Sequence, residues 1–136
     1  MKVVLDTNVL VSGLLSPFGP CGEIVSMVSS GELKLSFDAR ILLEYTEVLA
    51  RPKFQFNQEK VATLLDQIES CGQTVAPSPL RQPLPDRDDE PFLEVALSSK
   101  STCLITGNRI HFPEEFCQGM MIFSPSEFLT FYRRQV

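Results

Sequence analysis

Several residue types are scarce in this chain of 136 residues, and each scarcity excludes a class of protein. There is no tryptophan, and the only histidine is His111. The cysteines are far apart and form no CxxC pair, so the paired ligands of a structural zinc site are missing. We expect free thiols or small buried side chains in a reducing compartment at all four positions, Cys21, Cys71, Cys103 and Cys117.

Long hydrophobic runs are also missing. No apolar stretch approaches the roughly 20 residues of a membrane span. The opening run ends at Asp6, which makes it shorter than the apolar region of about 7–15 residues in a secretion signal. We therefore expect a cytoplasmic protein that contacts no membrane. No glycine-rich phosphate loop follows the first apolar run, which excludes a dinucleotide fingerprint and a P-loop.

Positive charge is in deficit, with a formal net charge of −5. This balance argues against a broad basic surface for nucleic acid. It does not exclude a nucleic-acid enzyme, because four or five acids gathered at one metal site would account for most of the imbalance. The hydrophobic share of 43% is enough for a real core, and the length predicts one domain, residues 1–136.

Short apolar or β-branched runs alternate with longer segments of helical periodicity. Residues 77–85 contain four prolines and predict a connector. Strands separated by helices predict an α/β fold with a parallel sheet and helices on both faces. The expected strands are 3–6, 32–37, 73–76, 102–106 and 120–123, and the expected helices are 9–15, 22–30, 39–50, 57–72, 91–99 and 124–134.

Polar side chains directly follow two of the expected strands. Asp6, Thr7 and Asn8 come after the first, and Thr106 and Asn108 come at the end of the fourth. Each group alone could be a turn or a helix cap. Sites in parallel sheets collect at the carboxyl ends of the strands, however, and both groups fall there.

A glutamate of the helix 39–50 has an ambiguous position. The apolar stripe of this helix includes Ile41, Tyr45 and Val48, and Glu44 lies near its edge. Glu47 lies nearly opposite the centre of the stripe and is expected to face water. Glu44 is either a solvated boundary residue or a side chain that looks toward the sheet.

Four acids precede the helix 91–99: Asp86, Asp88, Asp89 and Glu90. Acids in front of a helix cap its free N–H groups and favour the positive end of its dipole, so we expect at least one of them to do only that. Four acids in five positions exceed what one cap needs. A cation would relieve their mutual repulsion.

Clustered oxygen ligands with few nitrogen or sulfur partners suit Mg²⁺ or Mn²⁺. Such ions activate water and hold phosphoryl oxygens. No serine–histidine–acid or cysteine–histidine arrangement competes, and we expect His111 to be a loop or structural residue. Substrate phosphates would meet candidate cations, each of which is otherwise a solvated surface charge: Arg51, Lys53, Arg81, Arg87 and Arg109.

Four segments, in this order and spacing, resemble the PIN-domain family: "VVLDTNVLVSGLL", "ILLEYTEVLARPKF", "DRDDEPFLEVAL" and "LITGNRIHFP". More narrowly they are similar to the bacterial PIN proteins regarded as toxin components of toxin–antitoxin pairs, which are related to VapC toxins. The resemblance spans nearly the whole chain. It implies a three-layer α/β/α fold with a central parallel sheet of about five strands, and metal-dependent ribonuclease activity on single-stranded RNA.

The resemblance also implies roles for individual residues. Asp6, Glu44 and Asp89 match the family's catalytic, metal-binding acids, and Asp86 matches a frequent acid just upstream. Asn108 stands where many PIN proteins have a fourth aspartate, so we expect a secondary, water-mediated metal contact from it. Supporting polar contacts are expected from Thr7, Asn8 and Thr106.

The resemblance further implies a cognate antitoxin that caps the site with a basic side chain, and a homodimer. The residues leave two other functions open. One is a catalytically weak PIN-fold protein that binds RNA or a protein partner. The other is a phosphohydrolase with Asp6 as a covalent nucleophile, against which stands Asn8, where a second acid would be needed. The apolar residues of the last helix could form an interface or core, and we favour core.

Overall fold

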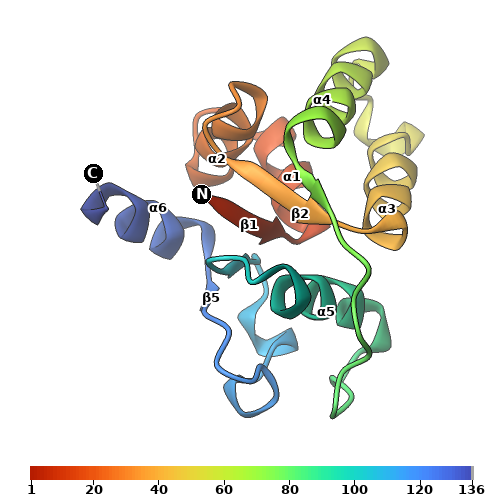
Figure 1. The fold of residues 1–136 in the computed structure, drawn as a ribbon. Helices are drawn as coiled ribbons and strands as arrows, with labels where there is room; N and C mark the ends of the chain where they lie inside the picture. Colours follow the sequence, from red (N-terminus) through yellow and green to blue (C-terminus); the bar gives the residue numbers. More distant parts are fainter. Residues whose placement is uncertain (136) are drawn as a thin grey trace.

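A parallel sheet lies at the centre of the computed structural model, which describes residues 1–135 (Figure 1). Five strands of the described residues pair in the order β3-β2-β1-β4-β5, and every pairing is parallel. The strands are β1 (Lys2–Leu5), β2 (Lys34–Phe37), β3 (Gln73–Thr74), β4 (Leu104–Ile105) and β5 (Ile122–Phe123). All five lie inside or at the expected segments.

Helices on both sides of the sheet complete a three-layer α/β/α fold, as expected. In Figure 1, α5 lies on one side of β1 and β2, and α1 and α2 lie on the other. Helix α3 contacts α1, α4 and α5, and α6 packs against α2 and β5. The helices are α1 (Thr7–Leu15), α2 (Pro20–Ser29), α3 (Ala39–Leu49), α4 (Gln58–Cys71), α5 (Glu90–Ser99) and α6 (Pro125–Arg134).

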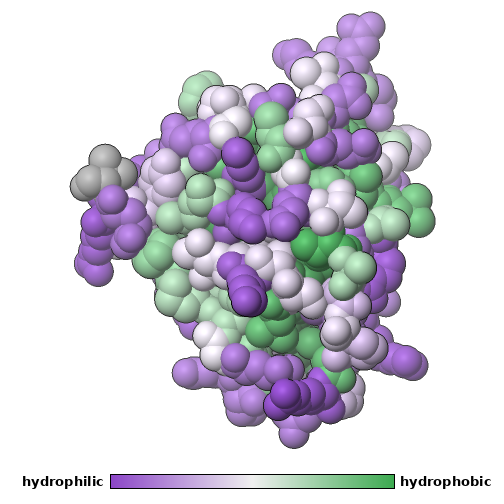
Figure 2. All heavy atoms as spheres, viewed as in Figure 1, coloured by the Kyte–Doolittle hydropathy of each residue, from purple (hydrophilic) through white to green (hydrophobic). Residues whose placement is uncertain are grey.

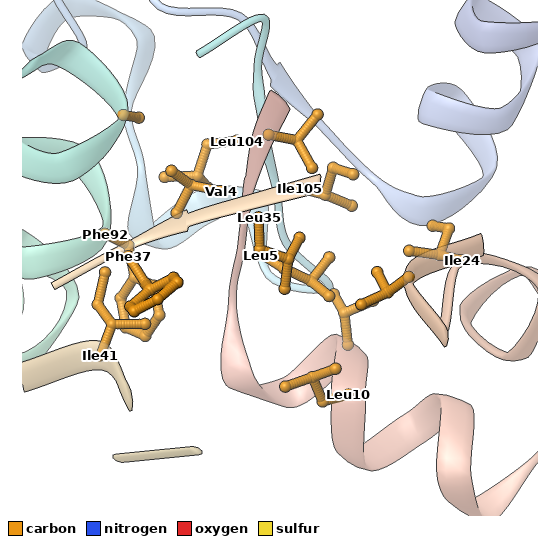
Figure 3. Close-up of a cluster of buried hydrophobic side chains, with 14 of the residues drawn as sticks. Val4, Leu5, Leu10, Ile24, Leu35, Phe37, Ile41, Phe92, Leu104 and Ile105 are labelled. Carbon is orange, nitrogen blue, oxygen red and sulfur yellow. The ribbon is translucent and has the colours of Figure 1, made fainter. Parts of the chain in front are cut away.

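The core is built around β1, whose residues Val3, Val4 and Leu5 are completely buried. This is the burial expected for a central strand of a parallel sheet covered on both faces. Figure 3 shows Leu5 beside Leu35 and Leu104 beside Val4, with side chains from the flanking helices around them. Hydrophilic side chains cover the upper and lower ends of the face in Figure 2, and hydrophobic ones show nearer its centre.

Capping residues fix where the helices begin. The Asp38 carboxylate accepts a hydrogen bond from the Ile41 amide at 3.0 Å and caps α3. Asn57 caps α4, and Ser124 and Glu127 form a capping box at the start of α6. Helix α1 begins at Thr7, two residues earlier than expected, because the Asp6 carbonyl at the N-cap position accepts a hydrogen bond from the Val9 amide at 3.0 Å.

Two sequence expectations about side chains also hold in this structure. The four cysteines are free thiols in the part of the chain described, and Cys103 and Cys117 are buried. Phe128 and Leu129 of α6 are buried within the single chain, so they belong to the core.

No single helix of residues 1–135 is long and apolar enough to cross a membrane. Helices α1 and α2 reach that length and composition only as a pair bent by 102°.

Candidate metal centre

The carboxyl ends of β1 and β4 meet and carry the first part of the site. The Asp6 amide donates to the Ile105 carbonyl at 2.9 Å, which aligns the two strand ends. The hydroxyl of Thr106 then donates to Asp6 Oδ2 at 2.8 Å, and the Asn8 amide group donates to the same oxygen at 3.4 Å. The Asn8 side chain also accepts from the Gly107 amide at 3.2 Å. The expected supporting residues Asn8 and Thr106 therefore hold Asp6.

Asp6 does not act as a helix cap. It occupies the N-cap position of α1, yet within residues 1–135 its side chain makes no capping hydrogen bond to that helix. Burial raises the pKa of Asp6. The Thr106 hydroxyl, the nearby amides of Thr7 and Asn8, and the charge of His111 lower this pKa in part. A buried carboxylate that the helix does not need for capping is available for a ligand.

Glu44 reaches the same edge from the middle of α3. The Thr7 hydroxyl donates a hydrogen bond to Glu44 Oε2, so the first residue of α1 holds this carboxylate. Burial is the largest effect on the pKa of Glu44 and raises it; the hydrogen bond from Thr7 lowers it in part. The negative charges of Asp6 and Asp88 raise this pKa further, and the positive charge of Arg51 lowers it. Glu47 is exposed, as the helical periodicity predicted. Glu44 therefore looks toward the sheet edge and lies within the electric field of Asp6.

Two of the acids before α5 satisfy backbone groups. Asp86 accepts from the Asp88 amide at 2.9 Å and caps the short 3-10 helix Arg87–Asp89. Glu90 accepts from the Leu84 amide at 3.0 Å and holds the end of the proline-rich connector. A capping role is therefore observed for one acid of this run, but it serves the 3-10 helix and not α5, whose N-cap residue Asp89 makes no capping hydrogen bond among the described residues. Asp86 remains near the site, because its charge contributes to the raised pKa of Asp89.

Asp89 is the acid whose hydrogen-bonding capacity is least satisfied. It occupies the N-cap position of α5 without a capping hydrogen bond among the described residues. Its Oδ2 atom is buried, and no group of residues 1–135 makes a hydrogen bond to it. Burial, and next the charge of Asp6, raise the pKa of Asp89 to about 6; His111 lowers it, and Asp86 and Glu44 raise it. Three acids from three distant segments thus repel one another at one edge of the sheet.

Asn108 and His111 complete this edge, although no sequence pattern pointed to a functional role for His111. Asn108 Nδ2 lies 3.0 Å from His111 Nε2, and His111 Nδ1 lies 3.1 Å from Asp89 Oδ2. The second pair is within ion-pair distance but is not aligned as a hydrogen bond. His111 is therefore part of the site, and the expectation of a loop or structural residue is incomplete. The spacing of three between Asn108 and His111 was the only available signal, since the 3-10 helix Arg109–His111 brings them together.

The expected substrate-binding cations are distributed unevenly. Arg51 is close enough to the site for its charge to lower the pKa of Glu44. Lys53 lies over the Phe54 ring, with Nζ 5.1 Å from the ring centroid. Arg81 and Arg87 are exposed. Arg109 is engaged by Glu127 of α6 at 3.0 Å, so its guanidinium would have to leave that partner to meet a phosphate.

The donor set fits a hard divalent cation. Carboxylate, amide and hydroxyl oxygens dominate the edge, and Asp89 Oδ2 is a buried oxygen without a hydrogen bond from the residues described. No group of three or more His, Cys, Asp or Glu side chains in residues 1–135 is arranged so that it could hold a metal ion by itself. Mg²⁺ needs no such group, because it keeps several waters and is bound through one or two carboxylates plus substrate phosphates.

A parallel sheet of this order with acids at its carboxyl edge defines an α/β domain with a candidate metal centre. Residues 2–110 match the PIN domain family, and the chain belongs to this family. PIN domains are generally nucleases and typically use divalent metals, which supports a hydrolase. The chain is also 30% identical over 112 residues to the Uncharacterized protein MJ1680 of Methanocaldococcus jannaschii. That alignment covers 80% of this chain and 72% of the archaeal protein.

Proposed function

We propose that this protein is a Mg²⁺- or Mn²⁺-dependent ribonuclease that hydrolyses phosphodiester bonds of single-stranded RNA. One observation carries the proposal: Asp6, Glu44 and Asp89 come from distant segments, lie at one sheet edge, and all have raised pKa values. A fold gains nothing from gathering charges that destabilise each other unless a ligand compensates them. A cation is that ligand.

Asp6, Glu44 and Asp89 would hold the ion, one or two of them directly and the rest through its bound waters, with Asp86 and Asn108 contributing from the rim. When bound, a divalent ion at this place supplies an activated water and neutralises charge on the phosphoryl oxygens. The chain's own part is to keep the oxygens in position. Thr106 and Asn8 fix Asp6, and Thr7 fixes Glu44.

The substrate phosphates would be met by basic side chains outside the acid cluster. Arg51 is the best-placed of these cations, because its charge already acts on Glu44. Lys53, Arg81 and Arg87 are exposed and can reach a flexible strand of RNA. Arg109 would contribute after release from Glu127.

The test is cleavage of a panel of RNAs with and without Mn²⁺ by Asp6→Asn. We expect the variant to lose Mn²⁺-dependent cleavage and to unfold at a temperature no lower than the wild type, since the substitution removes a buried charge. Asp66→Asn is the matched control, because Asp66 is an exposed residue of α4. Undiminished cleavage by Asp6→Asn would defeat the assignment of the site.

A second candidate is a PIN-fold protein that binds RNA or a protein partner and cleaves poorly. It is favoured by Asn108, which adds no charge to the site, and by the lack of a ready group of three metal ligands among residues 1–135. Calorimetry with Mn²⁺ separates the two candidates. Absence of binding at millimolar Mn²⁺ would favour the binding protein.

The biological role we propose is the toxin of a toxin–antitoxin pair in the cytoplasm. A cognate antitoxin would cap the site by placing a basic side chain among the acids, where it would relieve their repulsion as a metal does. A homodimer is part of the same proposal. Growth arrest on expression, relieved by co-expression of the product of a small neighbouring gene, tests the role. Sedimentation tests the dimer.

A further inference from the structure

His111 bridges two residues of the proposed metal centre. One ring nitrogen, Nε2, lies 3.0 Å from the Asn108 side-chain nitrogen, and the other, Nδ1, lies 3.1 Å from Asp89 Oδ2. Asn108 is anchored in turn, because its amide donates to the Thr106 hydroxyl at 3.0 Å and that hydroxyl donates to Asp6. A continuous series of contacts therefore runs from Asp89 through His111 to Asp6.

The contact with Asn108 decides what this residue offers to the site. When Nε2 accepts from the Asn108 side-chain nitrogen, the ring proton of a neutral imidazole lies on Nδ1, the atom that faces Asp89. The side-chain nitrogen of Asn108 is then engaged by the His111 ring. Its side-chain oxygen accepts no hydrogen bond from any residue between 1 and 135, so it remains available to a cation or a water.

Asn108 has no charge with which to attract a metal, so it can contribute to metal binding only through the orientation of its side-chain amide. An amide that rotates freely presents its nitrogen as readily as its oxygen. Groups behind a metal ligand that fix its orientation are worth about 10- to 100-fold in metal affinity. The His111 side chain is about two-fifths exposed, whereas the Asp89 side chain is 13% exposed, so His111 is the more solvent-accessible member of this pair.

We propose that His111 is a positioning residue of the metal centre, which engages the Asn108 side-chain nitrogen so that its oxygen is left for a ligand, and holds the Asp89 carboxylate in place. The inference rests on the proposed function, because it assumes that a divalent ion binds at these acids. It adds a residue that makes the neutral Asn108 usable as an oxygen ligand.

The experiment compares Mn²⁺ affinity, measured by calorimetry, in four variants of the full chain. His111→Ala and His111→Phe remove both polar contacts, and His111→Phe keeps a ring in place. We expect both to bind Mn²⁺ about 10-fold or more weakly than the wild type. His111→Gln carries an acceptor and a donor on one side chain and should recover most of the affinity. Ile110→Ala is the control, because Ile110 is in the same 3-10 helix, is 80% exposed and should have no effect.

A second readout is independent of metal and of cleavage. In the metal-free protein, the side-chain NH₂ signals of Asn108 in nuclear magnetic resonance should shift in His111→Phe and stay near their wild-type positions in His111→Gln. Equal or tighter Mn²⁺ binding by His111→Ala would overturn the inference and leave the proposed function standing. A wild type that binds no Mn²⁺ would overturn the proposed function, and the inference with it.

Discussion

The Thr106 hydroxyl donates a hydrogen bond to Asp6 Oδ2 at 2.8 Å, across a separation of 100 residues in the chain. Thr106 is completely buried and Asp6 is 7% exposed. The bond joins the ends of two neighbouring strands and stabilises the charged form of Asp6, whose pKa is otherwise raised by burial. One hydroxyl thus links two strand ends and also lowers the pKa of an acid in the site.

Replacing this hydroxyl should therefore affect both stability and metal binding. Thr106→Val keeps the shape of the side chain but removes the donor to Asp6 and the acceptor for the Asn108 amide. We expect a loss of about 1–3 kcal/mol in the free energy of unfolding and weaker Mn²⁺ binding. Denaturant titration and calorimetry measure the two effects. Thr106→Ser retains the hydroxyl and should lie near the wild type; a Val variant as stable as the Ser variant would contradict the prediction.

Two glutamates of α3 provide a matched pair. Glu44 is partly buried and held by Thr7, whereas Glu47 is exposed on the same helix. Glu44→Gln should lower Mn²⁺ affinity by about 10-fold or more, because it removes a charged oxygen ligand, and Glu47→Gln should change it by less than about twofold. Calorimetry on both variants checks this. Equal effects would mean that only the overall charge of the helix matters.

The raised pKa values predict a specific dependence of stability on pH. The folded carboxyls of Asp6, Glu44 and Asp89 hold their protons to higher pH than the unfolded chain does, Asp89 to about 6. The folded state thus binds more protons in this window, so the stabilisation is complete below about pH 4 and is lost as the pH rises through 6. The metal-free protein should therefore unfold at lower temperature at pH 7 than at pH 5.

Asp89→Asn isolates the contribution of one carboxyl to this trend. We expect the variant to lose less stability than the wild type between pH 5 and 7 in the absence of metal. The difference should be no more than about 1 kcal/mol, because solvent screens the charge of this partly exposed group and reduces the roughly 1.4 kcal/mol that each pKa unit would otherwise contribute. Thermal unfolding in a chelating buffer provides the measurement. Parallel pH profiles would show that Asp89 titrates normally.

Gly22, in the first turn of α2, permits the close approach of the connection between α1 and α2. A Cβ atom added at Gly22 would lie 2.1 Å from the Pro17 carbonyl oxygen, which cannot move without its backbone. Gly22→Ala should cost about 1–3 kcal/mol in the free energy of unfolding. Gly19 is the control, since its nearest neighbour would be 3.8 Å away and Gly19→Ala should be tolerated. Chemical denaturation of both variants distinguishes them.

Most of the fold followed from local patterns in the sequence. Asp38, Asn57 and Ser124 cap the starts of α3, α4 and α6 with their own side chains, and capping by a side chain at the helix start is a local signal. Strands β3, β4 and β5 are only two residues long, whereas the sequence pattern predicted strands of four or five residues at these places. The extent of pairing in short strands depends on the neighbouring strands, which periodicity does not describe.

The candidate site divides in the same way. The positions of Asp6 and Thr106 followed from the rule that sites lie at strand ends. The helical wheel left two orientations open for Glu44, and the contact with Thr7 shows which one is adopted. His111 could not be selected, because its role depends on a 3-10 helix that turns its ring toward Asp89. The metal, the RNA substrate and the antitoxin remain predictions.

The order of the strands has a consequence for protein synthesis. Strand β1 leaves the ribosome first, and β4, its neighbour on one side, is made about a hundred residues later. Until then Asp6 lacks the hydroxyl that holds it, and the loop that carries Asn108 does not exist. A nascent chain that stops before β4 therefore cannot assemble the acidic edge. The complete centre can form only after the segment from β4 to His111 has been translated.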